Sequence, residues 1–541
     1  MDQLTGSGKP LLFSKGREVI AIGLVAFLSL SLNLIGVTSG LPSSERSQYY
    51  PSGMSWLKSP QTAERLYETA PYESYHPDEG ALLNALSNMK PGAMDFNPHY
   101  FNYPSFHIYV TGAMLTIARI MGFVQIVNSK LFYSQHPEEM ARIYLFGRLL
   151  CAVMGALSVI ALYLCGRALF DSSVAFFGAL SLAVTALWVR DSHFMLVNIP
   201  SAMWMIGSAA CAIAAINRPS LKLVVWSAFL AGLAASTKYP AGTILILSLF
   251  AWYKMRNRST GLASLAIMIG CFVLGFLMGT PYALLAPSEF LNGIFFEARS
   301  KMGFLSPRVF LSNFLIAHGT VLAVIVAIGV GFVLLTLKNW RSQVLLLWIL
   351  AGFATVIVSK SDFIRYVIPA LPPLALCSGI ALDRLHRSFF LPRLRISAIS
   401  MVGTILLLLP AFAYSVNIDV LLSGNDVRNR AAAWISSMHV EHRDIGIYGN
   451  LYFDMPPING DSHRIVNLES NIAAAPRMVV YSTRTCSRRN WPDSTQRLMP
   501  ELTQMKVFTQ QPLSCWIFPV HWYPEDWEYT FLNVFVRYKE E

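Results

Sequence analysis

Charged residues are scarce in this chain: they make up 13% of its 541 residues, whereas hydrophobic residues make up 54%. A soluble globular domain carries about a quarter charged residues, so the low content excludes an ordinary soluble protein. The mean hydropathy is +0.46, and many apolar runs are long enough to cross about 30 Å of hydrocarbon. The sequence therefore predicts an α-helical protein that crosses a membrane many times.

The acidic residues are fewer than the basic ones, 31 Asp and Glu against 42 Lys and Arg. No basic stripe interleaved with aromatic residues accompanies this excess, so we expect no nucleic-acid partner. The sequence also lacks a Gly-rich loop of the kind that holds nucleotide phosphates. Instead the basic residues stand in short clusters between apolar runs, which is how membrane topology is encoded.

Cysteine is rare too, with seven residues in the whole chain. Five of them lie in apolar runs, where cysteine acts as a small core residue. Cys486 and Cys515 lie in the polar C-terminal region. They can form a disulfide if that region is extracytoplasmic, although spacing alone does not establish the pairing.

Eleven apolar runs are long enough to span a membrane, near residues 19–39, 143–164, 172–189, 195–215, 221–237, 240–253, 263–281, 312–336, 343–359, 363–381 and 395–416. A twelfth candidate, residues 105–127, carries His107 and Arg119. If the N-terminus is cytoplasmic and 105–127 does not span, basic pairs such as Arg218 with Lys222 face the cytoplasm, as the positive-inside rule requires. We therefore expect about eleven spans, with 105–127 as an amphipathic helix in the outer interface.

This topology divides the chain into a transmembrane domain, residues 1–416, and an extracytoplasmic domain, residues 417–541. Within the first domain, residues 40–142 form a first outer loop with interfacial helices, and residues 284–311 form a second outer loop. The C-terminal region predicts a small α/β fold, with a helix over 425–438 and short strands at 445–450, 477–484 and 515–520. We expect an integral protein of the plasma or inner membrane, with a cytoplasmic N-terminus and surrounding lipid as a partner.

Two adjacent acids stand in the first outer loop. The stretch YHPDEGALLNALSNM, residues 75–89, places Asp78 and Glu79 directly after Pro77. Proline suits a first helical position and acids in a first turn complement the helix dipole, so this pair can serve the helix alone. On the outer side of a membrane, a partly desolvated carboxylate can also act as a general base toward a hydroxyl or amine. Both interpretations stay open at this point.

Other polar residues gather on the same predicted side. Arg190, Asp191 and His193 stand at the outer end of one span. They form either a solvated turn with a salt bridge or a polar wall that contacts an acceptor or a sugar. His107 and Asn198 are further candidates for such contacts.

Lys238 and Arg365 are cations at the outer ends of spans, against the inside-positive trend. Each can snorkel to lipid headgroups. Together with Tyr239 and Tyr366 they can instead hold a phosphate at membrane depth. Residues 365–374, RYVIPALPPL, contain three prolines, and the helix breaks that prolines cause are tolerated where the backbone lines a protein cavity.

A lipid-linked phosphosugar fits this set of residues. Its lipid lies among the spans, its phosphate contacts Lys238 or Arg365, and its sugar faces Asp78. Negative charge grows on the phosphate as the sugar–phosphate bond breaks, so fixed cations favour the transition state over the ground state. A lipid or solute transporter is the alternative, but it is expected to carry ionisable groups near the bilayer midplane and repeated halves, and neither is evident here.

The motifs, in their order along the chain, resemble polyprenyl-phosphate-sugar-dependent glycosyltransferases of the GT-C type. Within that type they resemble the dolichyl-phosphate-mannose protein mannosyltransferase-like family, which includes the aminoarabinose transferases of lipid A. The resemblance rests on HPDE, NYPSFHIYVTGAML, RIYLFGRLLCAVMGALSVIALYLCGRALF, RDSHFMLVNIP, ASTKYPAG and FIRYVIPALPPLAL, over roughly residues 70–380. It implies a GT-C fold and an extracytoplasmic lipid, polysaccharide or protein acceptor.

The resemblance also implies roles for individual residues. Asp78 matches the acid that deprotonates or positions the acceptor, supported by Glu79, and Lys238 and Arg365 match donor-phosphate positions. The implied reaction inverts the anomeric carbon in one displacement. Asn198 stands where many relatives have an aspartate, which removes a charged ligand that a divalent metal would favour. No cofactor is therefore assigned, a divalent metal is in doubt, and an inactive relative stays an alternative.

Overall fold

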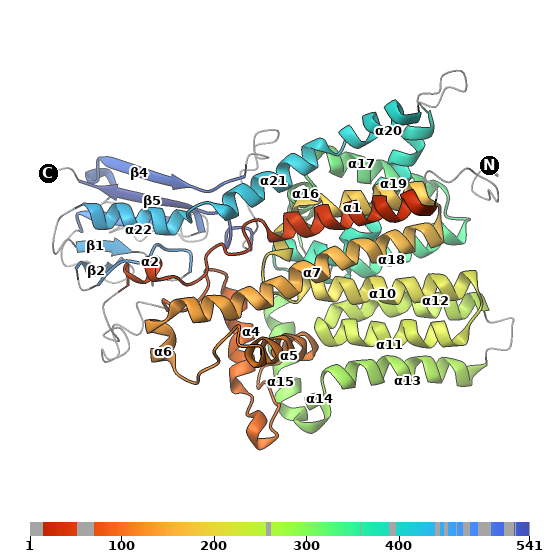
Figure 1. Ribbon diagram of the computed structural model, residues 1–541, viewed down its shortest axis with the longest axis horizontal. Coiled ribbons are helices and arrows are strands. Elements are labelled where there is room, and N and C mark those ends of the chain that lie inside the picture. Colours follow the sequence, from red (N-terminus) through yellow and green to blue (C-terminus); the bar gives the residue numbers. More distant parts are fainter. Residues whose placement is uncertain are drawn as a thin grey trace. The chain divides into compact units, whose positions relative to one another are not determined.

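The computed structural model describes residues 15–50, 70–255, 261–303, 305–357, 359–388, 397–438, 444–447, 453–460, 462–468, 476–484, 499–512, 524 and 526–539. The chain forms two compact units (Figure 1). The first unit comprises Met1–Ile35, Leu82–Met114 and Arg148–Asp419, and the second comprises Gly36–Ala81, Leu115–Gly147 and Val420–Glu541. The division falls inside the helix α4 (Pro77–Asn88), between Ala81 and Leu82.

The first unit is built from helices. Its longer α-helices are α1 (Lys15–Leu34), α8 (Ser172–Ala183), α10 (Asn198–Asn217), α11 (Leu221–Thr237), α12 (Leu245–Met255), α13 (Leu262–Gly279), α15 (Pro287–Lys301), α16 (Pro307–His318), α17 (Thr320–Leu335), α18 (Trp340–Ile357), α19 (Leu371–Ser388) and α20 (Ser397–Leu406). The shorter elements are α9 (Ala186–Ser192), η2 (Tyr239–Ile244), α14 (Tyr282–Leu285) and η3 (Ile364–Ala370). Three further helices, α5 (Phe106–Ile120), α7 (Pro137–Leu169) and α21 (Leu409–Ser423), lie in both units.

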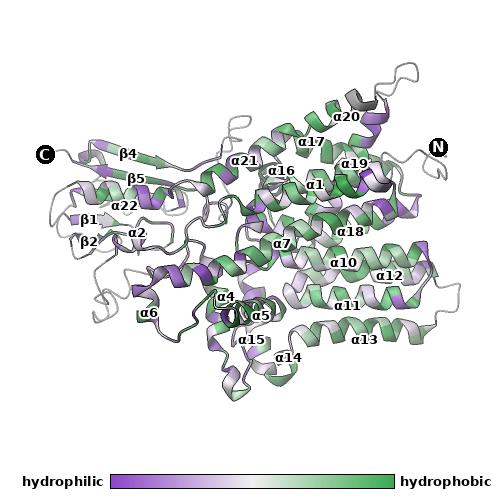
Figure 2. Cartoon of the chain, viewed as in Figure 1, coloured by the Kyte–Doolittle hydropathy of each residue, from purple (hydrophilic) through white to green (hydrophobic). Residues whose placement is uncertain are grey.

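Apolar residues run along most of these helices (Figure 2). Within the described residues, five helices are long and apolar enough to cross a membrane: Gly16–Leu34, Pro137–Leu169, Asn198–Asn217, Leu262–Gly279 and Ile364–Ser388. Two bent helix pairs raise this number to seven. These lengths and compositions make the chain an integral membrane protein. The expected total of about eleven spans stays a prediction.

Residues 312–336 do not form the single straight helix that the apolar run predicted. The helices α16 and α17 meet at an angle of 111°. Gly319 connects them with φ +71°, a left-handed backbone conformation that residues with a Cβ rarely adopt. The apolar run therefore corresponds to α17 plus the end of a separate helix.

The amphipathic segment predicted at 105–127 forms the 15-residue helix α5. At 1.5 Å per residue, a helix of this length covers about 22 Å, which is shorter than the hydrocarbon layer. Ile117, Ile120 and Met121 are exposed near its C-terminal end. Its length and exposed apolar side chains suit an interfacial position, as the charge pattern predicted.

Two glycines allow close packing of α11 against α13. A Cβ added to Gly232 would lie 2.1 Å from the carbonyl oxygen of Phe272, and a Cβ added to Gly275 would lie 2.3 Å from that of Phe229. Small residues at a helix crossing let the two backbones approach closely. This packing stabilises helix association in lipid, where no hydrophobic driving force favours it.

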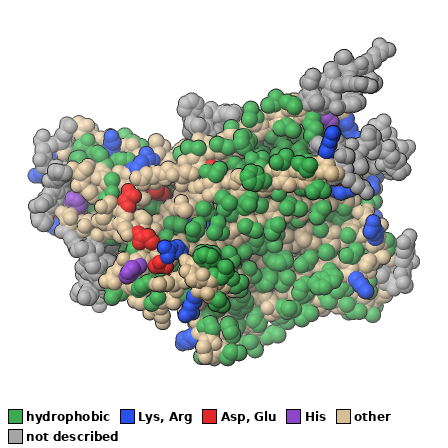
Figure 3. Space-filling view, viewed as in Figure 1, with side chains coloured by type: hydrophobic (Ala, Val, Ile, Leu, Met, Phe, Trp, Pro, Cys, Tyr) green, Lys and Arg blue, Asp and Glu red, His purple; other side chains and the backbone are tan. Residues whose placement is uncertain are grey.

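The helices of the first unit share a cationic end. There the Asn217 side chain donates a hydrogen bond of 2.9 Å to the carbonyl oxygen of Ala168, and Arg387 forms an ion pair of 2.6 Å with Asp171. Lys and Arg side chains gather at the right-hand edge of this view (Figure 3), over the ends of α12, α13 and α19. The described basic residues at these helix ends, such as Lys254 in the last turn of α12 and Arg387 in the last turn of α19, come from clusters that were predicted to face the cytoplasm.

The second unit contains a five-stranded sheet with the strand order β2-β1-β3-β5-β4. The strands are β1 (Asp444–Ile447), β2 (Arg464–Asn467), β3 (Met478–Ser482), β4 (Gln504–Thr509) and β5 (Asn533–Tyr538). β1 pairs in parallel with β2 and β3, whereas β5 pairs antiparallel with β3 and β4. The helix α22 (Val427–Ser437) buries Val427, Ala431 and Ile435 in the same core as the strands. The unit also holds α2 (Ser44–Ser47) and α6 (Lys130–Gln135).

The prediction of a helical membrane protein with a small C-terminal α/β region is confirmed. The expected helix at 425–438 is α22, with Asp426 as its N-cap. The strand expected at 445–450 overlaps β1, and the strand expected at 477–484 contains β3. The strand expected at 515–520 and the disulfide expected between Cys486 and Cys515 lie outside the described residues.

Candidate functional site

A buried polar network joins three helix ends in the first unit. Arg190 forms an ion pair with Asp191 through Nη1 and Oδ1 at 2.8 Å. The Asn198 amide donates to Asp191 Oδ2 at 3.0 Å, and Lys238 Nζ donates to Asn198 Oδ1 at 2.8 Å. All four side chains are at most 5% exposed. Asp191 and Asn198, which were predicted to contact the acceptor or the sugar, are therefore members of a hydrogen-bonded chain of residues that ends at Lys238.

Breaks in the helices create this arrangement. The helices α8 and α9 meet at 58°, so that Arg190 and Asp191 lie in a separate short helix. Asn198 begins α10, and Lys238 stands in extended conformation (φ −152°, ψ 120°) between α11 and η2. Irregular backbone at membrane depth is tolerated where it is buried in protein, and here each break carries a polar side chain into the network.

Two aromatic rings extend the network to further cations. Lys238 Nζ lies 4.9 Å from the centre of the Tyr366 ring, which lies 5.6 Å from the Phe363 ring. The Arg365 guanidinium and Lys301 Nζ each lie 4.4 Å from the Phe363 ring centre. The structure thus links Lys238, Arg365 and Tyr366, the residues predicted to bind the donor phosphate, through contacts between cations and aromatic rings.

Lys301 and Phe363 belong to this cluster but were missed in the sequence. Lys301 is in the last turn of α15, inside the predicted second outer loop. Its backbone carbonyl accepts a hydrogen bond of 2.9 Å from Lys360, which ties the end of α15 to the segment before η3. A lysine near the end of a loop helix carries no distinctive signal, because its partner lies more than sixty positions away in the chain.

The arrangement suits an anion. Among the residues named above, Lys238, Arg365, Lys301 and Arg190 are cations, and Asp191 is the one carboxylate. Buried cations near aromatic rings bind phosphate through charge-assisted hydrogen bonds, and flat apolar rings can pack against a lipid or a sugar face. Of these cations, Lys238, Arg365 and Lys301 lie beside the aromatic rings, whereas Arg190 is paired with Asp191.

The two histidines predicted as sugar or acceptor contacts are buried. His193 Nδ1 lies 2.7 Å from the Val189 carbonyl oxygen, and Nε2 lies 2.8 Å from that of Ile35. His107 Nε2 lies 3.8 Å from Cys151 Sγ. These contacts give both side chains a packing role, and their contact with a substrate stays a prediction.

Asp78 and Glu79 lie in the first turn of α4, in the second unit. Glu79 is fully buried and accepts a hydrogen bond of 2.6 Å from Ser74 Oγ. Asp78 is half-buried. The two acids are therefore in different environments, and Asp78 is the more exposed of the two. A cavity shared by Asp78 with Lys238 and Arg365 stays a prediction.

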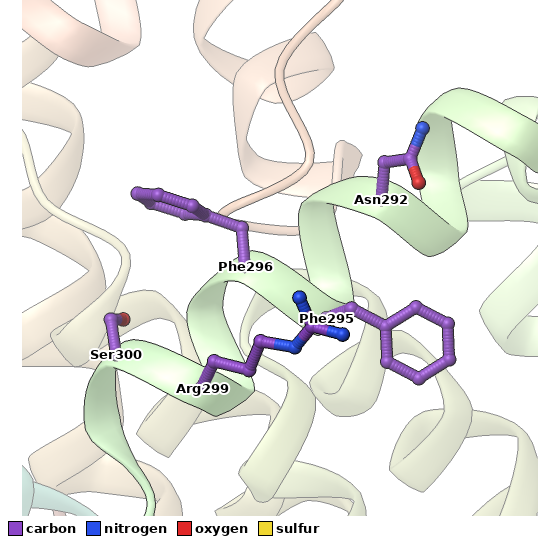
Figure 4. A pocket seen from close by; sticks show the side chains of 5 residues that line it. All are labelled: Asn292, Phe295, Phe296, Arg299 and Ser300. Carbon is purple, nitrogen blue, oxygen red and sulfur yellow. The ribbon is translucent and has the colours of Figure 1, made fainter.

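A shallow hollow of about 450 Å³ lies along α15. It is lined by Asn292, Phe295, Phe296, Arg299 and Ser300. Phe295 and Phe296 are both more than half exposed, and Arg299 extends along the helix between them (Figure 4). Exposed aromatic rings beside a guanidinium are typical of a surface in contact with lipid headgroups.

Within the described part of the chain, no three or more His, Cys, Asp or Glu side chains are grouped as a metal site would need. Near Lys238, Asn198 supplies a neutral amide where a carboxylate would strengthen a divalent-metal site, and its oxygen accepts a hydrogen bond from Lys238. We therefore assign no metal ligands.

Comparisons with known proteins bear on the same segment. Residues 145–284, which contain Arg190, Asp191, Asn198 and Lys238, match the family model described as dolichyl-phosphate-mannose-protein mannosyltransferase. Among curated proteins, none matches the chain.

Three solved structures illustrate the structural similarity. ArnT from Cupriavidus metallidurans, bound to undecaprenyl phosphate, is 15% identical, with 97% of this chain and 98% of that chain covered and a TM-score of 0.46. The apo oligosaccharyltransferase of Archaeoglobus fulgidus is 13% identical, with 80% and 63% covered and a TM-score of 0.46. The S. cerevisiae protein O-mannosyltransferase Pmt1-Pmt2 complex, bound to its sugar donor, is 16% identical, with 57% and 38% covered and a TM-score of 0.32.

This chain therefore spans less than two thirds of the length of the Archaeoglobus enzyme. With TM-scores below 0.5, these structural similarities establish no activity. The resemblance expected from the sequence is confirmed for residues 145–284, where this chain matches the dolichyl-phosphate-mannose-protein mannosyltransferase family.

Proposed function

We propose that this chain is a membrane glycosyltransferase that moves a sugar from a polyprenyl-phosphate donor to an extracytoplasmic lipid, polysaccharide or protein, with inversion at the anomeric carbon. The observation that carries the proposal is the buried network from Arg190 to Lys238, because all of it falls within the segment that matches the mannosyltransferase family. We further propose that the N-terminus is cytoplasmic and that residues 417–541 lie outside.

In this proposal, the donor phosphate lies against the cations. Lys238, Arg365 and Lys301 approach from three elements and are joined by the Tyr366 and Phe363 rings. Asn198 holds Lys238 Nζ at 2.8 Å, so the ammonium is oriented before the donor binds. Such preorganised cations stabilise the charge that develops on a departing phosphate.

Asp78 acts on the acceptor. Its carboxylate removes the proton from the acceptor hydroxyl or amine as that atom attacks the anomeric carbon. The bond from that carbon to the phosphate oxygen breaks in the same step, and polyprenyl phosphate leaves with the bonding electrons. Attack from the side opposite the phosphate inverts the anomeric carbon. Glu79, held by Ser74, fixes the first turn from which Asp78 projects.

Mass spectrometry tests the proposal even though the transferred sugar is unidentified. Glycans and lipids are compared between cells with and without this chain, and the sugar that differs is then supplied on a polyprenyl phosphate to membranes that contain the protein. We expect one sugar to appear on one acceptor class, in proportion to the protein. Identical glycan and lipid profiles, together with no transfer from any polyprenyl-phosphate sugar, would contradict the proposal.

A further inference from the structure

The residue before HPDE is held between two arginines within the second unit. The guanidinium carbons of Arg46 and Arg428 each lie 3.9 Å from the centre of the Tyr75 ring. The Tyr75 hydroxyl donates a hydrogen bond of 2.6 Å to Asn429 Oδ1. Tyr75, Arg46 and Arg428 are at most 3% exposed, so the ring is enclosed. We call Arg46, Tyr75, Arg428 and Asn429 the tyrosine clamp.

Each arginine of the clamp is fixed by its own segment. Arg46 donates to the Glu73 carbonyl oxygen at 2.7 Å and to the Tyr50 hydroxyl at 3.0 Å. Arg428 forms a two-pronged ion pair with Asp426, at 2.7 and 2.6 Å. The clamp therefore joins the first outer loop to the start of α22, the first helix of the C-terminal region.

His76 makes a second contact with the same region. Its ring meets the Tyr529 ring edge-on at 5.6 Å, and Tyr529 meets Phe453 at 4.8 Å. Arg428 donates to the Phe453 carbonyl oxygen at 2.8 Å. Arg428 therefore supports both the contact of Tyr75 and that of His76 with the C-terminal region. Burial raises the pKa of Tyr75, which keeps its hydroxyl neutral and able to donate to Asn429.

We propose that the tyrosine clamp makes the C-terminal α/β region a positioning element for Asp78. Tyr75 and His76 are bound to that region, and Asp78 follows two residues after His76 in the first turn of α4. Fixing two consecutive residues at the entrance of a helix fixes the direction in which its first turn projects. The inference rests on the proposed role of Asp78, and it assigns the C-terminal region a part in catalysis that the sequence did not suggest.

Three variants test the clamp. Tyr75→Leu removes the ring from between the arginines, whereas Tyr75→Phe keeps the ring and loses only the bond to Asn429. Trp434→Leu is the matched control, because Trp434 lies on the same helix, α22, and packs on Phe508 and Tyr538. Each purified full-length variant is normalised to folded protein by size-exclusion chromatography before kcat and KM are measured.

We expect Tyr75→Leu to lower kcat about 10- to 100-fold with little change in the donor KM, since misplacement of a reacting group by about 1 Å has effects of this size. Tyr75→Phe retains most of the turnover, and Trp434→Leu retains the turnover of the folded fraction. Equal kcat losses in Tyr75→Leu and Trp434→Leu, or an unchanged kcat in Tyr75→Leu, would show that the clamp serves folding alone.

Amide hydrogen exchange separates this inference from the proposed function. Residues 76–80 should exchange faster in Tyr75→Leu than in the wild type or Trp434→Leu. Unchanged exchange in this segment would overturn the clamp even if the wild type transfers sugar. If the wild type transfers no sugar but exchange rises as expected, the proposed function fails while the clamp still holds the segment before Asp78.

Discussion

Burial of a lysine at a helix end raises the free energy of the folded state unless hydrogen bonds compensate its charge. Lys238 is 5% exposed and donates to Asn198, which in turn donates to Asp191. The sequence predicted Lys238 because a cation at the outer end of a span opposes the charge rule. The sequence did not indicate Lys301 or Phe363 as site residues, because the contact between them depends on how α15 packs against the segment before η3.

Replacing Lys238 by Met tests the donor site at this scale. We expect sugar transfer to fall by about 100-fold or more, because one fixed group that stabilises transition-state charge has effects of this order. Lys254→Met is the control, since Lys254 is exposed near the opposite end of the next helix, α12. Transfer is measured in membranes at equal protein content. An equal loss in both variants, or none in either, would remove Lys238 from the donor site.

The long helices could be predicted from hydrophobic runs, because about twenty consecutive apolar residues have few alternatives to a span. Elements whose shape depends on tertiary packing could not be predicted from the sequence. The strand β4 lies at the edge of the sheet and is largely exposed, so its sequence shows no regular alternation of apolar and polar residues. The bend between α16 and α17 depends on the backbone conformation of Gly319, which a hydropathy pattern does not reveal.

At the scale of elements, the contact between α11 and α13 depends on glycine. Gly275→Ala would place a Cβ within 2.3 Å of the Phe229 carbonyl oxygen, so the two helices must separate. We expect a loss of about 1–3 kcal/mol in the free energy of unfolding, as for other overpacked sites. Thermal unfolding in detergent micelles shows this as a lower midpoint temperature.

The control lies on the same helix. A Cβ added to Gly270 would meet nothing within 4 Å, and alanine is the better helix former by about 1 kcal/mol. Gly270→Ala should therefore leave the midpoint unchanged or raise it. If the midpoint of Gly275→Ala also stays unchanged, the close approach of α11 and α13 is not what stabilises this part of the first unit.

The predicted topology of the whole chain rests on the positions of its basic residues. Arg218 is at the cationic end, beside the Asn217–Ala168 contact, while α15 belongs to the predicted second outer loop. The sequence alone predicted this division, because positive clusters alternate with spans in a regular order. It could not predict that residues 36–81 and 115–147 form one compact unit with the C-terminal region, since this depends on contacts such as those of Tyr75 and Arg428.

Cysteine labelling tests the sidedness. In a variant whose native cysteines are replaced, Ser300→Cys should react with a membrane-impermeant maleimide in intact cells, because Ser300 is exposed on α15. Arg218→Cys should react only after the membrane is permeabilised. The reverse pattern, or both sites on one side, would contradict the predicted orientation.

The role of Asp78 can be separated from the role of any acid at a helix start. Glu139 is a matched control, because it also lies in the first turn of a helix that begins with proline, α7. Both acids complement a helix dipole, whereas we propose general-base catalysis for Asp78 alone.

The most direct measurement is therefore the rate of sugar transfer from a polyprenyl-phosphate donor by Asp78→Asn and Glu139→Gln at equal amounts of folded protein. The account predicts a rate at least about 100-fold lower for Asp78→Asn, the usual size of a lost general base, and an unchanged rate for Glu139→Gln. Full activity in Asp78→Asn would contradict it.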